Sequence, residues 1–209
     1  MKAVPARRPA RAASLWMRLR IALFVALGAF FTILSLFPPA IVHAGNVRPA
    51  LIAVTAGPRF SAEEMDLGSA AAFGGRIGLG ITERMSVWLD GATSSPERRT
   101  SGIAAHVTAI RAMVQGRILT GVLRPYLVLG GGALVFNYGD AYDGVGAILT
   151  VGGGVDWRIA ERTLLFTEST ADIYGTTNTI RSPTGAELYS SPGDTQAATA
   201  LSVGIVVEF

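Results

Sequence analysis

One histidine and one hydroxyl in this sequence have a spacing that could support acid–base chemistry. His106 is followed two residues later by Thr108, and in an extended strand these two side chains point to the same side. An imidazole beside a hydroxyl is the minimal arrangement for a base that activates a nucleophile. The hydroxyl is not that of a serine, however, and no acidic residue has a matching position. The residues therefore favour a histidine near a strand end without a catalytic role.

Other kinds of site have little support. The chain has no cysteine, which excludes disulfides and thiolate metal sites, and no cluster of residues has the spacing of a metal site. The glycine runs 130–132 and 152–154 could suggest phosphate loops, but they lie inside strand-like segments with no helix after them. We therefore predict no catalytic, cofactor-binding or metal-binding residues, and no cofactor.

The positive charge of the chain is concentrated before residue 21. An apolar run follows at 21–37, and then come Pro38, Pro39 and the small residues Val42 and Ala44 around His43. A basic start, an apolar run and a small-residue end predict a signal peptide at 1–44, with cleavage after Ala44. The rival interpretation is an inner-membrane anchor, because about 17 apolar residues approach the length needed to span a bilayer. Without this segment the basic excess disappears, so nucleic acid is not an expected partner.

After Pro49 the sequence alternates between apolar and polar residues instead of showing helical periodicity. The clearest segment is 146–159, in which Leu149, Val151 and Trp157 lie on one face and Asp156 lies on the other. Turn-forming residues divide the chain into eight such segments. Strands are therefore predicted at 50–60, 71–82, 85–94, 103–119, 125–138, 146–159, 163–174 and 197–209.

The connections between these strands alternate in length. Three are tight turns, whereas the stretches 61–70, 95–102, 139–145 and 175–196 are longer, polar and rich in Gly, Pro, Ser and Asp. Short turns on one side and long loops on the other are typical of bacterial outer-membrane barrels, with the turns in the periplasm. The loop at 176–196, which contains Tyr189, is predicted either to bind a partner or to be a disordered surface loop.

The orientation of the apolar faces decides between a membrane barrel and a soluble one. Strands of about 10–13 residues match a tilted crossing of the hydrocarbon, whereas soluble strands are usually shorter. Aromatic residues near the strand ends predict two interfacial belts. One belt would contain Tyr126, Trp157 and Phe209, and the other Phe60, Phe73, Phe136, Tyr138 and Tyr174.

If the apolar faces point outward, the polar faces line a narrow lumen. Eight strands make a barrel whose interior is just filled by side chains, so arginines and carboxylates there are expected to pair and plug it. The residues predicted inside are Arg76, Asp90, Arg111, Gln115, Arg117, Asp156, Arg158, Glu168, Asp172 and Glu208.

Residues 48–209 resemble the eight-stranded bacterial outer-membrane β-barrel superfamily, which includes the OmpA transmembrane domain and opacity-type surface proteins. The resemblance rests on the sequence from Arg124 to Tyr126 before a Gly-rich strand, on 152–158 before 160–162, and on the last strand, whose alternating apolar residues end in Phe209. It implies an all-β, closed, antiparallel up-and-down transmembrane barrel at 45–209, located in the bacterial outer membrane. It also implies contact with outer-membrane lipids and lipopolysaccharide, and recognition of Phe209 by the assembly machinery.

The resemblance leaves several functions open. We expect a monomeric, non-enzymatic protein with a structural role or a surface-interaction role through its loops. A lipid A-modifying enzyme built around His106 is an alternative, because outer-membrane lipid A deacylases place a histidine and a serine at a similar spacing on the outer wall of a barrel. A narrow pore is another, and a soluble periplasmic lipocalin-like barrel is the architectural alternative.

Overall fold

The structure, a computed structural model, describes residues 49–61, 67–97, 99, 102, 104–137, 143–181 and 187–209. The predicted signal peptide at 1–44 lies outside these residues. Within the described part of the chain, no helix is both long and apolar enough to cross a membrane.

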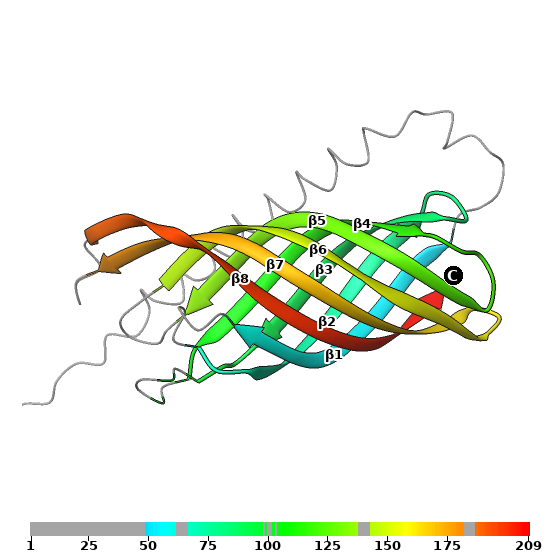
Figure 1. Ribbon diagram of the computed structural model, residues 1–209, viewed down its shortest axis with the longest axis horizontal. Helices are drawn as coiled ribbons and strands as arrows, with labels where there is room; N and C mark the ends of the chain where they lie inside the picture. Colours follow the sequence, from blue (N-terminus) through cyan, green and yellow to red (C-terminus); the bar gives the residue numbers. More distant parts are fainter. Residues whose placement is uncertain are drawn as a thin grey trace, which may run out of the picture.

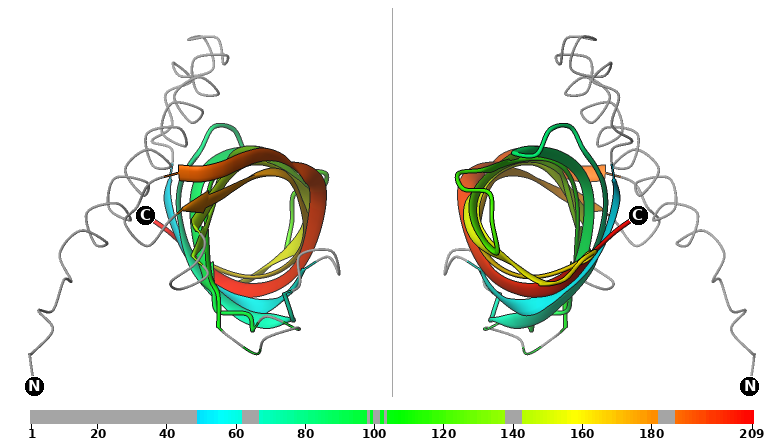
Figure 2. Two further views of the ribbon diagram at one scale, coloured as in Figure 1. Left: turned by 90° about the vertical axis from the view of Figure 1, so that its left-hand side faces the viewer. Right: turned by 90° about the vertical axis from the view of Figure 1, so that its right-hand side faces the viewer.

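Eight antiparallel strands form a closed barrel in which each strand pairs with the next in sequence and β1 pairs with β8. Seen along its axis, the barrel is a complete ring (Figure 2). The strands are β1 (Ala50–Ser61), β2 (Ala70–Gly80), β3 (Met85–Ser94), β4 (His106–Arg117), β5 (Leu123–Asn137), β6 (Asp143–Ala160), β7 (Thr163–Arg181) and β8 (Glu187–Glu208). The predicted fold class, an all-β up-and-down barrel, is confirmed.

The tight connections and the carboxy-terminal residue lie together at one end of the barrel (Figure 1). We call this the turn end and the opposite one the loop end. The β2–β3 turn is two residues longer on the β2 side than expected, because Thr82 Oγ1 accepts hydrogen bonds from the amides of Arg84 and Met85 at 3.2 and 3.0 Å. This local bonding ends β2 at Gly80 instead of Thr82. Strand β4 is also shorter than predicted, since it begins at His106 and ends at Arg117.

The prediction of a long loop at 175–196 is wrong for most of its length. Strands β7 and β8 continue as a paired hairpin from Thr177, opposite Pro192, to Arg181, opposite Glu187. This hairpin extends beyond the other strands at the loop end (Figure 1). Two register irregularities, at 175–177 and 180–181, interrupt the pairing. They obscure the period of two in the sequence, although threonines and Ile180 favour strand structure here.

The two faces of the wall confirm the orientation predicted for a membrane barrel. Large apolar side chains point away from the lumen and remain exposed, as shown by Leu127 at 63%, Val203 at 57% and Phe73 at 62% of their surface. Charged side chains of the opposite parity are buried inside. A soluble barrel would bury its apolar faces in the lumen, so the lipocalin-like arrangement is not adopted.

The predicted aromatic belts are only partly present. Phe60, Phe73, Trp157 and Phe209 are exposed on the outside, whereas Tyr138 lies outside the described residues. The remaining three, Tyr126, Phe136 and Tyr174, are buried inside the barrel. Their position near strand ends suggested an interface, but their parity along β5 and β7 is that of the lumen.

Candidate functional site

A group of oppositely charged side chains crosses the middle of the lumen. It contains three arginines and three carboxylates, contributed by five different strands, and every member is buried. We call this group the lumen belt: Arg59, Arg76, Asp90, Arg111, Glu168 and Asp172.

Asp90 on β3 links the two central arginines of the lumen belt. The Nε of Arg76 donates to Asp90 Oδ1 at 2.7 Å. On the other side, Nε and Nη2 of Arg111 lie 2.8 and 2.6 Å from Asp90 Oδ2. One carboxylate therefore compensates two guanidinium groups that project from the neighbouring strands β2 and β4.

Each central arginine reaches a second carboxylate across the lumen, on β7. Arg76 makes a bidentate contact with Glu168, with distances of 2.9 and 2.5 Å, and the Tyr126 hydroxyl donates to the same carboxylate at 3.0 Å. Arg111 Nη1 donates to Asp172 Oδ1 at 3.0 Å. The hydroxyl of Thr150 also donates to Asp172, at 2.7 Å.

Arg59 on β1 completes the belt through Asp172. Its Nη2 lies 3.1 Å from Asp172 Oδ2. The formal charges of the six side chains therefore sum to zero. Removal of one partner from a buried ion pair leaves an uncompensated charge that costs several kcal/mol, so loss of any one of these side chains should destabilise the barrel.

A second polar group lies closer to the turn end. Asp156 accepts hydrogen bonds from Arg117 Nε at 3.2 Å and from Gln115 Nε2 at 3.1 Å, and Gln115 Oε1 accepts one from the indole of Trp88 at 2.7 Å. A cavity of about 10 Å³ separates this group from the belt, and Arg76, Tyr126 and Asp156 are among the residues that line it. That volume is room for about one water molecule.

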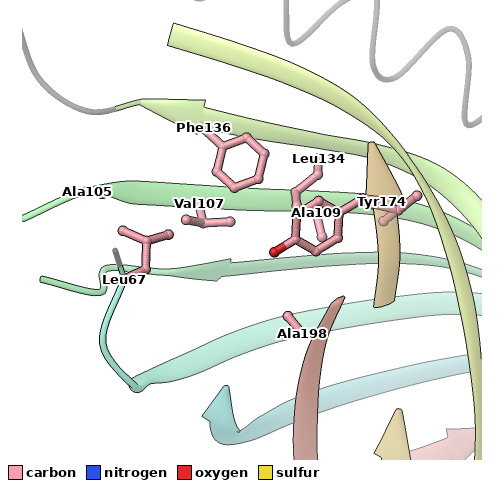
Figure 3. Close-up of a cluster of buried hydrophobic side chains, with 9 residues drawn as sticks. Leu67, Ala105, Val107, Ala109, Leu134, Phe136, Tyr174 and Ala198 are labelled. Carbon is pink, nitrogen blue, oxygen red and sulfur yellow. The ribbon is translucent and has the colours of Figure 1, made fainter. Parts of the chain in front are cut away.

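Apolar side chains fill the lumen on either side of the belt. The cluster at the loop end is shown in Figure 3, where Phe136 and Tyr174 have ring centroids 5.9 Å apart. Its members are Leu67, Ala105, Val107, Ala109, Leu134, Phe136, Ile148, Tyr174 and Ala198. The cluster toward the turn end contains Leu51, Ala53, Trp88, Met113, Val128, Leu164, Phe166 and Val206.

Four of the largest lumenal side chains lie directly beside a glycine of the neighbouring strand. The register pairs Trp88 with Gly78, Met113 with Gly130, Tyr126 with Gly154, and Phe166 with Gly204. At each of these glycines, an added Cβ would approach the partner's side chain to between 2.5 and 2.8 Å. The glycines therefore provide the space that the bulky side chains occupy, which agrees with the high glycine content of the chain.

Eight of the ten residues predicted for the lumen are buried there. The two exceptions, Arg158 and Glu208, lie at the turn-end rim, where they form a partly exposed ion pair at 3.6 Å. Arg59 and Tyr126 were not predicted inside. Arg59 has the parity opposite to the exposed Ile52 and Val54, and this pattern in β1 could have identified it.

The hydroxyl in contact with His106 is not the predicted one. Ser95, in the β3–β4 connection, places its Oγ 2.9 Å from His106 Nδ1, and both residues are exposed at the loop end. Sequence spacing favoured Thr108, but cross-strand pairing brings Ser95 to the imidazole because Ser94 is opposite Val107. Among the described residues, no group of three His, Cys, Asp or Glu side chains could hold a metal ion.

Comparisons with known proteins identify the fold. No family model matches the sequence, and no curated protein matches it. Among solved structures, Neisserial surface protein A superposes with a TM-score of 0.52 at 18% identity, over 77% of this chain and 97% of that one. The N-terminal β-barrel domain of Pseudomonas aeruginosa OprF gives 0.50 at 15% identity, over 78% of this chain and 100% of that one. The fold is thus that of the eight-stranded outer-membrane barrels that the sequence resembles.

Proposed function

We propose that this protein is an integral outer-membrane barrel with a sealed lumen, which has a structural role or interacts with partners through its loop end. The observation that carries the proposal is the inverted polarity of the wall. Exposed leucines and valines surround an interior that contains paired arginines and carboxylates. Such a wall is stable only where lipid covers the outside, because water would otherwise contact a continuous apolar surface.

The filled interior favours a structural or binding role over a pore. The lumen belt compensates its own charges, and apolar clusters lie above and below it. An ion would have to separate buried ion pairs in order to pass. The loop end therefore carries the surface available for partners, and the β7–β8 hairpin extends that surface outward (Figure 1).

Two measurements on the refolded chain 45–209 test this proposal. Gel mobility with and without boiling should reveal a compact form that is lost on heating, and planar bilayers should show no regular conductance steps. Absence of the mobility shift together with solubility in plain buffer would overturn the membrane assignment. Discrete conductance steps would overturn the sealed lumen but leave the membrane barrel in place.

A second candidate function is hydrolysis of an acyl ester in the outer leaflet, and the contact between Ser95 and His106 favours it. The Ser95 hydroxyl would add to the ester carbonyl while His106 accepts its proton and delivers it to the departing alkoxide. Water would then cleave the acyl-serine, so that the net products are an alcohol and a carboxylic acid. Lipid A is an ester of this kind that the loop end of an outer-membrane barrel would meet.

Three variants distinguish this candidate from a structural contact. Mass spectrometry of lipid A from strains carrying Ser95→Ala, His106→Ala or Thr108→Ala would report the acyl chains. The hydrolase candidate requires both of the first two variants to restore an acyl chain that the unaltered protein removes, whereas Thr108→Ala should behave as the unaltered protein. Identical lipid A in all strains, with or without the protein, would eliminate the hydrolase.

A further inference from the structure

We propose that the β4–β5 turn is inserted in the lipid of the periplasmic leaflet, so that the barrel is seated obliquely in the membrane. This inference rests on the proposed function as a membrane barrel. It concerns residues 118–123, which have the sequence Ile-Leu-Thr-Gly-Val-Leu. We call this segment the apolar turn.

The apolar turn exposes four large hydrophobic side chains and no charged one. Ile118, Leu119, Val122 and Leu123 each have more than half of their surface exposed. A short connection in the aqueous periplasm would ordinarily be polar, because turn residues are selected for hydrogen bonding and for contact with water. Contiguous exposed apolar groups of this kind mark a surface that another apolar phase covers.

The other two turns at the same end differ in composition. The β2–β3 turn contains Glu83 and Arg84, and the β6–β7 turn contains Glu161 and Arg162, all exposed. These charged turns are suited to water or lipid headgroups. The three connections are therefore unequal around the rim, and of these three turns the apolar turn alone is suited to insertion in lipid.

Hydrogen bonding within the apolar turn also suits a low-dielectric environment. Arg124 Nε donates to the carbonyl of Gly121 at 2.7 Å, the amide of Arg158 donates to the carbonyl of Val122 at 2.8 Å, and the amide of Ile118 donates to the carbonyl of Pro125 at 2.8 Å. Unpaired backbone groups are costly in lipid, where no water can bond to them. Three polar groups of this turn are thus already paired inside the protein.

The apolar turn continues the lipid-facing surface without interruption. Leu123 has the same outward parity as the exposed Leu127 and Leu129 on β5, and Trp157, its register partner on β6, is also exposed. A docking patch for a periplasmic protein would be expected to have a polar rim on the membrane side. Continuity with the lipid-facing strands therefore favours lipid as the occupant of this surface.

Site-specific fluorescence quenching tests this insertion, and the absence of cysteine from the chain makes single labels unique. The full chain 45–209 with Leu119→Cys would carry a polarity-sensitive fluorophore and be folded into phosphatidylcholine vesicles. Matched labels at Glu83→Cys and Glu161→Cys report the charged turns, and one at Leu127→Cys reports the lipid-facing wall. Each sample would be titrated with iodide in the water and with nitroxide-labelled lipid.

We expect the probe at 119 to resemble the probe at 127, with strong quenching by nitroxide lipid and weak quenching by iodide. The probes at 83 and 161 should show the reverse order. A probe at 119 that responds to iodide as they do, or that is protected from both quenchers as in a protein contact, would overturn the insertion while quenching at 127 still supports the membrane barrel. Loss of lipid quenching at 127 as well would overturn the proposed function itself.

Discussion

The inner and outer faces of this barrel are made by alternate residues of the same strands, yet they are specified in different ways. On β5, Tyr126 points inward and donates a hydrogen bond to Glu168, whereas Leu127 points outward and is largely exposed. Each side chain of the lumen belt has particular partners at particular distances. The outer side chains need only be apolar, because lipid adapts to their shape. The inner face therefore specifies one arrangement of side chains, whereas the outer face requires only an apolar environment around the barrel.

Removal of one charge from the lumen belt should have the largest effect on stability, and it tests whether the inner face depends on specific partners. Asp90→Ala would leave Arg76 and Arg111 without the carboxylate that links them. We expect a loss of about 3–5 kcal/mol in the free energy of unfolding, because breaking a buried pair leaves an uncompensated charge. Urea titration of the refolded barrel, followed by gel mobility, would measure it. A loss below about 1 kcal/mol would mean that water compensates the arginines.

A charge placed on the outer face should be nearly as costly, but for a different reason. Leu129→Arg adds a cation near the middle of β5, where the side chain is 58% exposed to the surroundings. In lipid we expect the free energy of unfolding to fall by about 2–4 kcal/mol, which is the cost of an arginine on the lipid-facing side of a barrel at the bilayer midplane. The same unfolding measurement in vesicles, with Leu129→Met as the control, checks this value. Equal stability of the two variants would place this position outside the hydrocarbon.

An added methyl group should also affect the two faces differently, with a smaller loss of stability than an added or removed charge. Gly204→Ala would direct a Cβ toward the carbonyl oxygen of Val54 and the ring of Phe166, whereas the matched variant Gly116→Ala has no atom within 4 Å of the new Cβ. Overpacking inside the lumen should cost about 1–3 kcal/mol, and the control should change stability by less. The unfolding midpoints of both variants would measure this difference in stability. If they coincide, the lumen can relax around the added group.

The smallest effect is expected at the turn-end rim. Glu208→Gln removes the partner of Arg158, whose side chain is 39% exposed and 3.6 Å away. Exposed ion pairs of this kind contribute about 0–1 kcal/mol, and salt screens them. Unfolding at low and at high salt should therefore give nearly the same stability for variant and parent. A larger loss that persists at high salt would assign this pair to the interior.

Much of the fold could be predicted because the period of two is a local property. The order of strands, their number and the facing of residues such as Arg111 and Asp156 all follow from alternation and from turn residues. The β7–β8 extension could not be predicted in the same way. Its strand structure depends on pairing between 177–181 and 187–192, and two register irregularities remove the alternation that would have revealed it.

The site was predictable in composition but not in connectivity. Sequence parity indicates that Arg76 and Glu168 share the lumen, but the contact between them joins strands that are far apart in the chain and depends on barrel closure. Ser95 was missed for a related reason. It follows β3 in a connection, and only the register of β3 against β4 brings its hydroxyl to His106.

The glycines beside Trp88, Met113, Tyr126 and Phe166 also bear on how the barrel assembles. Strands of a membrane barrel can slip by two residues and still keep their apolar side toward lipid, so facing alone does not select the register. At β8, such a slip would set Phe166 against Ser202 or Val206 in place of Gly204, and a side chain would meet the ring. Each glycine thus disfavours a two-residue slip in one strand pair, because the slipped register would produce a steric clash. Together they restrict the stagger in four of the eight strand pairs, and the stagger is one of the quantities that set the diameter of a closed barrel.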